Sequence, residues 1–440
     1  MKYISKYKSE KLFYTLVISG IWISLDTHFI NFNIENFKDF IFFLRALMPF
    51  IIFIILVTNI KKGSVKIFIK NNNELSILFL LIFIFQIPGL VFSQNSILNI
   101  SFIVNCISYL FFLFFFINDL NKLNLVLKIS LIIFTIIFLV YGLGLLNWFI
   151  FDSTNLNLYG SWPHGLKNFS FSENVPRSSG VARNATIVYI VFSLLIINKK
   201  KNIFNISIIT ISFVLIFLTQ SRIIIIFFTF YLLVYLLVIF SLSKKALYKI
   251  SILNIAIIVP LIATISLVMI QNSKIPNAEN YEFKKKEIYE NIFRPVNDKN
   301  IGIGSGRLND WKNIISNNNK NIIGYGAMGD RYLINQSASN FFVYIYASSG
   351  FIGLIISIIF FIIIAICCFK YLLYGKFRPT RKNYKFLISY ALIAFFLFRS
   401  LAETSFGIFG IDFLVFATAL HYILIYNKKF YKNNLINFKD

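Results

Sequence analysis

The sequence predicts an all-α polytopic integral membrane protein, and composition and run length carry that prediction. Of the 440 residues, 58% are hydrophobic and only 14% are charged, whereas soluble domains average about 25% charged residues. Apolar runs recur along the whole chain, and several reach the roughly 20 residues that a helix needs to cross a bilayer. The mean hydropathy of +0.73 agrees with these runs. A bundle of membrane-spanning helices is therefore expected.

Hydropathy and charge together predict about 12 transmembrane helices. They are expected at residues 12–30, 39–59, 75–92, 97–117, 125–147, 181–198, 203–220, 222–241, 250–270, 350–370, 385–400 and 407–426. If the N-terminus is cytoplasmic, the inner loops carry or adjoin lysines, while the short outer loops nearly lack them. Cytoplasmic loops of membrane proteins collect Lys and Arg in this way. Both termini are then expected in the cytoplasm.

Four consecutive parts follow from this arrangement. They are the first five spans with a long outer loop, spans six to nine, a large extracytoplasmic loop between spans nine and ten, and the last three spans, at 1–180, 181–270, 271–349 and 350–440. Long loops without a fold of their own are usually functional or disordered. Short helices are expected within the large loop at 280–293 and 307–316.

The net charge is +25. In a soluble protein, such an excess of positive charge would indicate binding to nucleic acid. In a membrane protein, the lysines and arginines of the cytoplasmic loops account for it, and no nucleic-acid partner is expected. The three cysteines, Cys106, Cys367 and Cys368, have neither metal-ligand nor disulfide-framework spacing. No metal site is predicted.

Arginines concentrate on the outer side of this arrangement. Seven of the ten lie outside or at the outer edge, against nine of the 33 lysines. Positive-inside topology does not require this difference. Arginine binds phosphate oxygens with two parallel hydrogen bonds and stays charged, so the split favours an anionic ligand outside. The alternative is that these arginines only decorate loops or extend to lipid headgroups.

The stretch GIGSGR at 302–307 is the clearest candidate for an anion site. It is not a nucleotide P-loop, because no Gly-Lys-Ser/Thr follows, and no βαβ unit accompanies it. We expect Arg307 to begin a helix capped by Ser305 or Gly306, which leaves free N–H groups for an anion. An outward-facing phosphate in a bacterial envelope is the diphosphate of a polyprenyl-linked glycan. A plain capped turn is the alternative.

Three further segments place arginines at the outer edge. They are RSSGVARNATIVYI with Arg177 and Arg183, LTQSRIIII with Arg222, and FRSLAETSFGIFGID with Arg399, Glu403 and Asp412. A charge within the bilayer is costly and normally functional. Glu403 is the best-placed carboxylate for proton transfer, or it pairs with an arginine.

Amides and aromatic rings in the outer loops suit a carbohydrate, although Asn is abundant throughout the chain. The candidates for glycan binding are Trp162, His164, Trp311 and Asn340.

Taken together, six segments resemble the O-antigen polymerase and ligase superfamily of bacterial envelope enzymes. They are SGVARNATIVY (179–189), TQSR (219–222), GSGRLNDW (304–311), IIGYGAMGD (322–330), SNFFVYIYASSGFIGL (339–354) and RSLAETSFGIFGIDFLVF (399–416). The resemblance covers roughly residues 170–420, and the last segment fits the polymerase branch especially well. The first five expected spans match only in being hydrophobic.

The resemblance implies an enzyme that uses a glycan carried on undecaprenyl diphosphate. It implies action at the outer face of the bacterial cytoplasmic membrane without metal, nucleotide or other cofactor. By motif, Arg183, Arg222 and Arg307 would contact the donor diphosphate, and we add Arg177 and Arg399 as candidates. Glu403 or Asp330 would take the proton of the acceptor hydroxyl. Membrane lipid surrounds the enzyme, and a flippase and a chain-length regulator are the implied protein partners.

One departure from the family separates its branches. The resemblance implies that ligases, which pass the glycan to lipid A-core, carry a histidine in the segment before SNFF. Here that segment reads NQSASN, which favours a polymerase that builds O-antigen, capsule or another surface polysaccharide. A ligase with His164 as a substitute base stays open. So does a lipid-linked glycan flippase, although mid-membrane charges and internal repeats, which such transporters show, are not evident.

Overall fold

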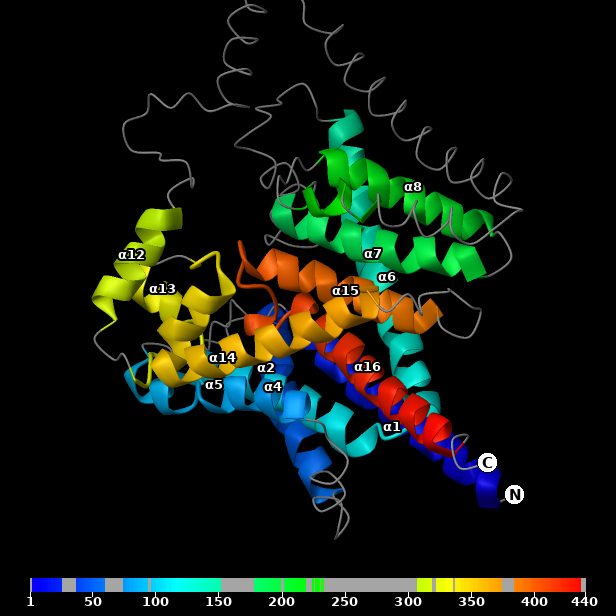
Figure 1. The fold of residues 1–440 in the computed structure, drawn as a ribbon, viewed down its shortest axis with the longest axis horizontal. Helices are drawn as coiled ribbons and strands as arrows, with labels where there is room; N and C mark the ends of the chain where they lie inside the picture. Colours follow the sequence, from blue (N-terminus) through cyan, green and yellow to red (C-terminus); the bar gives the residue numbers. More distant parts are fainter. Residues whose placement is uncertain are drawn as a thin grey trace, which may run out of the picture. The chain divides into compact units, whose positions relative to one another are not determined.

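All secondary structure in the described part of the chain is helical (Figure 1). The computed structural model describes residues 2–25, 37–59, 74–93, 96–151, 178–198, 202–218, 224, 226–229, 231–232, 307–318, 322–334, 337–373 and 384–436. The predicted all-α class is confirmed for these residues. The predicted spans at 222–241 and 250–270 and the predicted helix at 280–293 lie wholly or mostly outside them.

The chain divides into two compact units. Unit 1 comprises Met1–Ile133, Arg307–Phe377 and Lys385–Asp440, and unit 2 comprises Phe134–Gly306 and Arg378–Tyr384. Helices described in unit 1 are α1 (Lys2–Ile23), α2 (Phe37–Thr58), α4 (Glu74–Ile84), η2 (Pro88–Phe92), α5 (Ser96–Phe111), η3 (Phe112–Phe116), α12 (Arg307–Asn317), α13 (Gly329–Ile334), α14 (Phe341–Leu373), α15 (Tyr384–Ser400), η6 (Ser405–Gly407) and α16 (Ile411–Ile436). In unit 2, α7 (Ser178–Asn198) packs on α8 (Ile203–Leu218), and α6 (Leu120–Phe151) runs from unit 1 into unit 2.

Four described helices are long and apolar enough to cross a membrane. They are Glu74–Phe92, Asn99–Phe116, Leu120–Leu139 and Phe341–Cys368. They overlap the predicted spans at 75–92, 97–117, 125–147 and 350–370. Shorter apolar helices lie at Leu47–Thr58, Gly180–Ile196, Ile203–Ile216 and Ile411–Tyr426, again within predicted spans. The protein is therefore a helical membrane protein, while the count of 12 spans, the position of the large loop and the four-part division stay predictions.

Helix α14 begins earlier than the span predicted from residue 350. The side chain of Asn340 caps it, because its Oδ1 accepts hydrogen bonds from the N–H groups of Phe342 (2.9 Å) and Val343 (3.1 Å). An Asn at this position satisfies donors that have no partner within the helix. The apolar residues that follow, FFVYIYA, form the first turns of α14, which continues beyond a break at Gly350. The last residues of the predicted outer loop are thus helical.

The segment 322–330 packs against α14 at a break in that helix. Gly350 has φ 65° and ψ −160°, a conformation that residues with a Cβ rarely adopt. Just before the break, the carbonyl groups of Ala347 and Ser348 accept hydrogen bonds from the N–H groups of Tyr325 (2.8 Å) and Gly326 (2.9 Å). A Cβ on Gly350 would lie 2.2 Å from the carbonyl oxygen of Ile322. Because Gly350 has no Cβ, the backbone at Ile322 can lie directly against the backbone of α14.

An aromatic cluster fixes the α15–α16 hairpin, which we define as residues 399–412. Phe406 of η6 stacks on Phe416 of α16 with ring centroids 3.9 Å apart. Phe406 also contacts Phe341 of α14 at 4.6 Å and Phe79 of α4 at 6.1 Å. Buried aromatic pairs contribute about 0.5–1.5 kcal/mol each beyond the area they bury. The hairpin is thus anchored on three helices of unit 1.

Candidate active site

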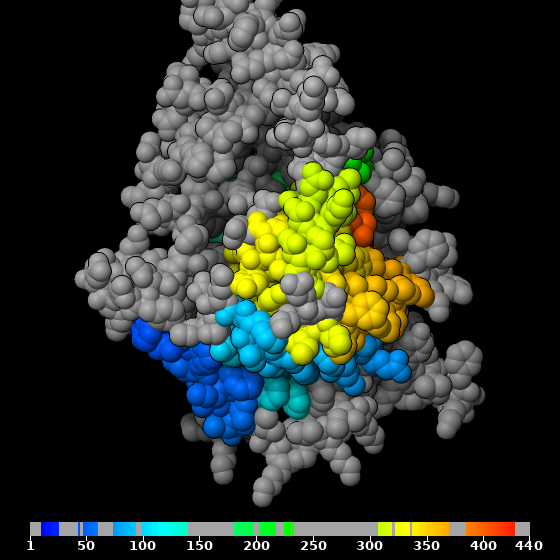
Figure 2. Space-filling view, turned by 90° about the vertical axis from the view of Figure 1, so that its left-hand side faces the viewer, coloured from blue at the N-terminus to red at the C-terminus, as the bar shows by residue number. Residues whose placement is uncertain are grey.

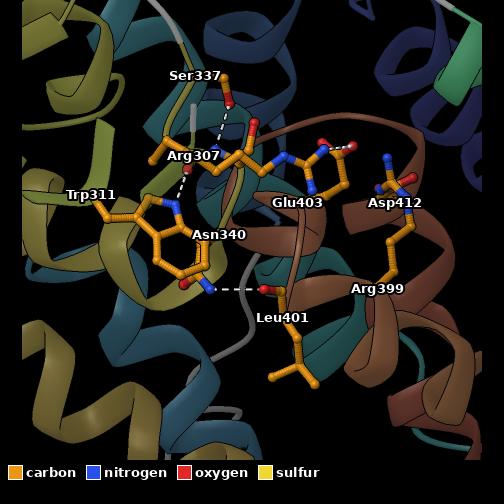
Figure 3. Close-up of polar contacts among 10 residues, drawn as sticks. Arg307, Trp311, Ser337, Asn340, Arg399, Leu401, Glu403 and Asp412 are labelled. Atoms are coloured by element: carbon orange, nitrogen blue, oxygen red, sulfur yellow. Dashed lines mark hydrogen bonds and ion pairs between the residues drawn. The ribbon is translucent and has the colours of Figure 1, made fainter. Parts of the chain in front are cut away.

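Arg307 is the first residue of α12 and faces the α15–α16 hairpin (Figure 3). Its Nη2 lies 3.8 Å from Oε1 of Glu403, and the two side chains are 32% and 26% exposed. The predicted helix at 307–316 is confirmed, as is the position of Arg307 at its start. The proposed caps Ser305 and Gly306 lie outside the described residues. A half-exposed arginine beside a helix N-terminus presents positive charge and N–H donors to solvent.

Arg399 and Asp412 form a second ion pair on the same hairpin. Arg399 Nη1 contacts Asp412 Oδ2, and the two side chains are 7% and 4% exposed. The pair joins the end of α15 to the start of α16. A buried charge needs its counterion, so the guanidinium of Arg399 is held inside the protein by Asp412.

The turn 337–340 is held by its neighbours on both sides. The indole N–H of Trp311 donates to the carbonyl of Ala338 (2.7 Å), and the N–H of Ala338 donates to Oδ2 of Asp330 (2.8 Å). Ser339 has φ 49°, a left-handed conformation that is uncommon for a residue with a side chain. The turn is therefore held in place by α12 and α13.

Asn340 connects this turn to the hairpin. Its Nδ2 donates to the carbonyl of Leu401 (2.9 Å), while its Oδ1 caps α14. Glycan binding by Asn340 stays a prediction, and in the structure its amide makes hydrogen bonds on both sides within unit 1. Figure 3 shows Asn340, Leu401, Arg307 and Glu403 in one neighbourhood.

Asp330 is fully buried at the start of α13. Burial raises the pKa of its carboxyl from 3.8 to about 6, and the hydrogen bond from Ala338 and the charge of Arg331 lower the pKa by smaller amounts. A carboxyl poised near neutrality is suited to acid–base chemistry in principle. Its position beneath the turn, however, leaves it no exposed surface.

Helix α12 lies at the surface of unit 1 (Figure 2). Figure 2 shows α12 on the exposed face of unit 1, beside the segment around residue 330 and near the hairpin around residue 400. Arg307 and Glu403 are therefore the charged predicted site residues of this region that solvent reaches, as their exposed fractions show.

The other predicted site residues divide into two groups. Arg183 lies on α7 in unit 2, where its Nε donates to Oδ1 of the adjacent Asn184 (3.1 Å). Arg177, Arg222, Trp162 and His164 lie outside the described residues. Sequence reasoning did not foresee the parts of the site that are backbone, the two polar groups of Ala338 and the carbonyl of Leu401. Backbone groups leave no residue-type signal in a sequence.

Comparison with known proteins gives a match to one family model. The fold and the site define a helical membrane protein with an arginine–carboxylate pair at a helix start. Residues 206–358 match the family model described as O-antigen ligase. This confirms the resemblance to the O-antigen polymerase and ligase superfamily and indicates a glycan-processing enzyme of that type. No curated protein and no solved structure matches the chain.

Proposed function

We propose that the protein is a polymerase that joins undecaprenyl-diphosphate-linked oligosaccharide repeat units into a surface polysaccharide. The observation that carries the proposal is the half-exposed Arg307–Glu403 pair, which brings a cation and a carboxylate together from segments distant in sequence. The match of residues 206–358 to the family model described as O-antigen ligase supports a glycan as the substrate. The reaction takes place at the extracytoplasmic face of the bacterial cytoplasmic membrane, with both termini of the chain in the cytoplasm.

Arg307 binds the diphosphate of the donor. In the transfer step, the bond between the anomeric carbon and the diphosphate oxygen breaks, and the electron pair leaves with undecaprenyl diphosphate. Charge develops on that oxygen, and a positioned arginine stabilises it more strongly in the transition state than in the ground state. The guanidinium suits this role because its planar fork matches phosphate oxygens.

Glu403 accepts the proton of the acceptor hydroxyl. The acceptor oxygen forms the new bond to the anomeric carbon as its proton moves to the carboxylate, so atoms and charge balance. General base catalysis of this kind contributes roughly 10²–10⁴-fold in rate. The pairing with Arg307 explains how donor and base sit side by side: when the diphosphate takes over the guanidinium, Glu403 is released beside the reacting carbon.

Polymerase and ligase differ at the turn 337–340. The resemblance implies a histidine before SNFF in ligases, and this chain has Ser337, Ala338 and Ser339 there. That favours the polymerase. The ligase reading keeps one specific observation in its favour, the description of the matching family model, and it is the second candidate function. A flippase has no such support.

Arg183, Arg222 and Arg177 are proposed as further diphosphate contacts, and Trp162 and His164 as glycan contacts. These assignments rest on the order of the sequence motifs and not on contacts in the structure. A flippase that delivers the lipid-linked unit and a chain-length regulator are the proposed protein partners.

The test is a gel of surface polysaccharide from a strain that lacks the gene. The strain is complemented with wild type, with Arg307→Ala, with Glu403→Gln, or with Lys312→Ala as the matched control. Lys312 is an exposed cation on the same helix and does not belong to the pair. We expect wild type and Lys312→Ala to restore a ladder, and the two site variants to leave a single capped repeat unit.

Other patterns would contradict the proposal. If the deletion strain lacks even the single capped unit at its surface, the protein is a ligase or a flippase. If Arg307→Ala restores a full ladder at wild-type protein level, the Arg307–Glu403 pair is not the site.

A further inference from the structure

Ala338 is the point at which three separate segments of unit 1 converge. Its side chain is fully buried, its carbonyl accepts from Trp311 of α12, and its N–H donates to Asp330 of α13. Both hydrogen bonds are short, at 2.7 and 2.8 Å, and the acceptor of the second is a carboxylate, which strengthens it. We call this arrangement the Ala338 clamp.

The clamp holds a strained turn. Ser339 follows Ala338 directly and has φ 49°, a conformation that is unfavourable for a residue with a side chain and persists only where surrounding contacts enforce it. Ser337 Oγ accepts from the N–H of Ser339 at 3.4 Å, a long contact that adds little. The two hydrogen bonds of Ala338 therefore restrain the turn from α12 and α13, and the hydrogen bond from Asn340 to Leu401 restrains it from the hairpin.

The turn 337–340 also contacts the α15–α16 hairpin, which carries Glu403. Asn340 donates to the carbonyl of Leu401, two residues before Glu403. Trp311 lies one turn along α12 from Arg307. The clamp thus links the segment that carries the arginine to the segment that carries the carboxylate (Figure 3).

On the basis of the proposed function, we infer that Asp330 and Trp311 are positioning residues, which set the distance between Arg307 and Glu403 through the main chain of Ala338. This differs from the roles that the sequence suggested, a catalytic base for Asp330 and a sugar-stacking ring for Trp311. Asp330 has no exposed surface at which to meet an acceptor hydroxyl. The indole N–H of Trp311 is already engaged by the turn.

Two substitutions of Asp330 separate positioning from catalysis. Asparagine keeps an oxygen that accepts from the N–H of Ala338 but does not take up a proton, whereas alanine removes the acceptor. The assay follows chain growth by the purified full-length protein in detergent, with lipid-linked repeat units extracted from the deletion strain. We expect Asp330→Asn to keep most of the wild-type rate and Asp330→Ala to lose about 100-fold, the scale of a small misalignment of reacting groups.

A base gives the opposite pattern. If Asp330→Asn loses about 100-fold or more while its melting temperature stays at or above that of wild type, Asp330 is catalytic and the inference fails. Should Asp330→Ala not fold, the asparagine variant still decides the question.

Trp311 provides an independent test. Phenylalanine keeps an aromatic face for a sugar but has no N–H for Ala338. The clamp predicts that Trp311→Phe loses activity as severely as Trp311→Ala, with Lys312→Ala of the same helix as the control. Wild-type activity of the phenylalanine variant, together with an inactive alanine variant, would assign Trp311 to stacking and overturn the inference.

The result of Arg307→Ala in the same assay separates this inference from the proposed function. An active Arg307→Ala variant refutes the site itself. An inactive one, combined with an inactive and folded Asp330→Asn, refutes the clamp alone.

Discussion

The ion pair that joins the two ends of the α15–α16 hairpin is buried, whereas the ion pair in its middle is partly exposed. Arg399 and Asp412, at the ends, pair with 7% and 4% of their side chains exposed. Glu403, within the hairpin, pairs with Arg307 while their side chains are 26% and 32% exposed. Both pairs join an arginine to a carboxylate, yet their surroundings differ completely.

Burial determines which of the two arginines is available to a substrate. Removing the partner of a buried charge costs several kcal/mol, so Arg399 cannot turn toward a diphosphate without abandoning Asp412. An exposed pair is worth only about 0–1 kcal/mol, so Arg307 can exchange Glu403 for phosphate oxygens at little cost. Arg399, predicted as a diphosphate ligand, is therefore reinterpreted as a structural residue, and Arg307 stays the candidate ligand.

The largest expected effect is on the buried pair. Asp412→Ala leaves the guanidinium of Arg399 buried without its counterion, and it should lower the free energy of unfolding by about 3–5 kcal/mol. Thermal unfolding of the purified protein in detergent measures this, with Glu403→Ala as the control. Equal melting temperatures for the two variants would show that burial does not separate the pairs.

A double substitution sharpens the same comparison. Arg399→Met with Asp412→Leu replaces the pair by apolar side chains, a change that is often neutral or stabilising in protein interiors. Its melting temperature should return close to that of wild type, well above that of Asp412→Ala. If the stable double variant makes no polymer, Arg399 contacts the donor after all, and the reinterpretation is wrong.

Asp330 extends the comparison to a buried carboxyl whose hydrogen bond comes from the backbone. Its pKa is raised from 3.8 to about 6 in the folded protein, so the folded state binds the proton more tightly than the unfolded state. This contribution to stability is present below about pH 4 and is lost as pH rises through about 6. The full loss is on the order of 3 kcal/mol.

The measurement is the melting temperature of wild type and Asp330→Asn between pH 4 and pH 8. Asparagine stays neutral, so the variant should gain stability relative to wild type above about pH 6, and the gap should close toward pH 4. A gap that is constant across this range would place the pKa of Asp330 at its ordinary value.

The smallest expected effect on stability concerns the exposed pair. Glu403→Gln should change the free energy of unfolding by less than about 1 kcal/mol, because solvent and salt screen the charges. The difference in melting temperature between wild type and Glu403→Gln should shrink as the ionic strength is raised. A large, salt-independent loss of stability would mean that Glu403 is structural in the way Asp412 is.

The sequence predicted the helical class well because hydropathy is a local property. The spans at 75–92 and 97–117 match described helices closely, since a long apolar run in a membrane has no alternative to a helix. The helix at Arg307 was also predictable, because Ser305 and Gly306 before it are residue types that cap helix starts. The start of α14 was missed because a single polar residue, Asn340, caps an apolar helix that extends into the expected outer loop.

From the sequence alone we could predict a helical membrane protein that resembles a family of glycan-processing enzymes, and we could name the candidate arginines and carboxylates. The tertiary structure separates these candidates by their burial and by their partners. Residue type is the same in Arg307 and Arg399, and in Asp330 and Glu403, but burial and partners are set by which distant segments pack together. Charge is written in the sequence, whereas the dielectric surroundings and the counterion that decide whether a charge binds substrate or stabilises the fold arise from packing.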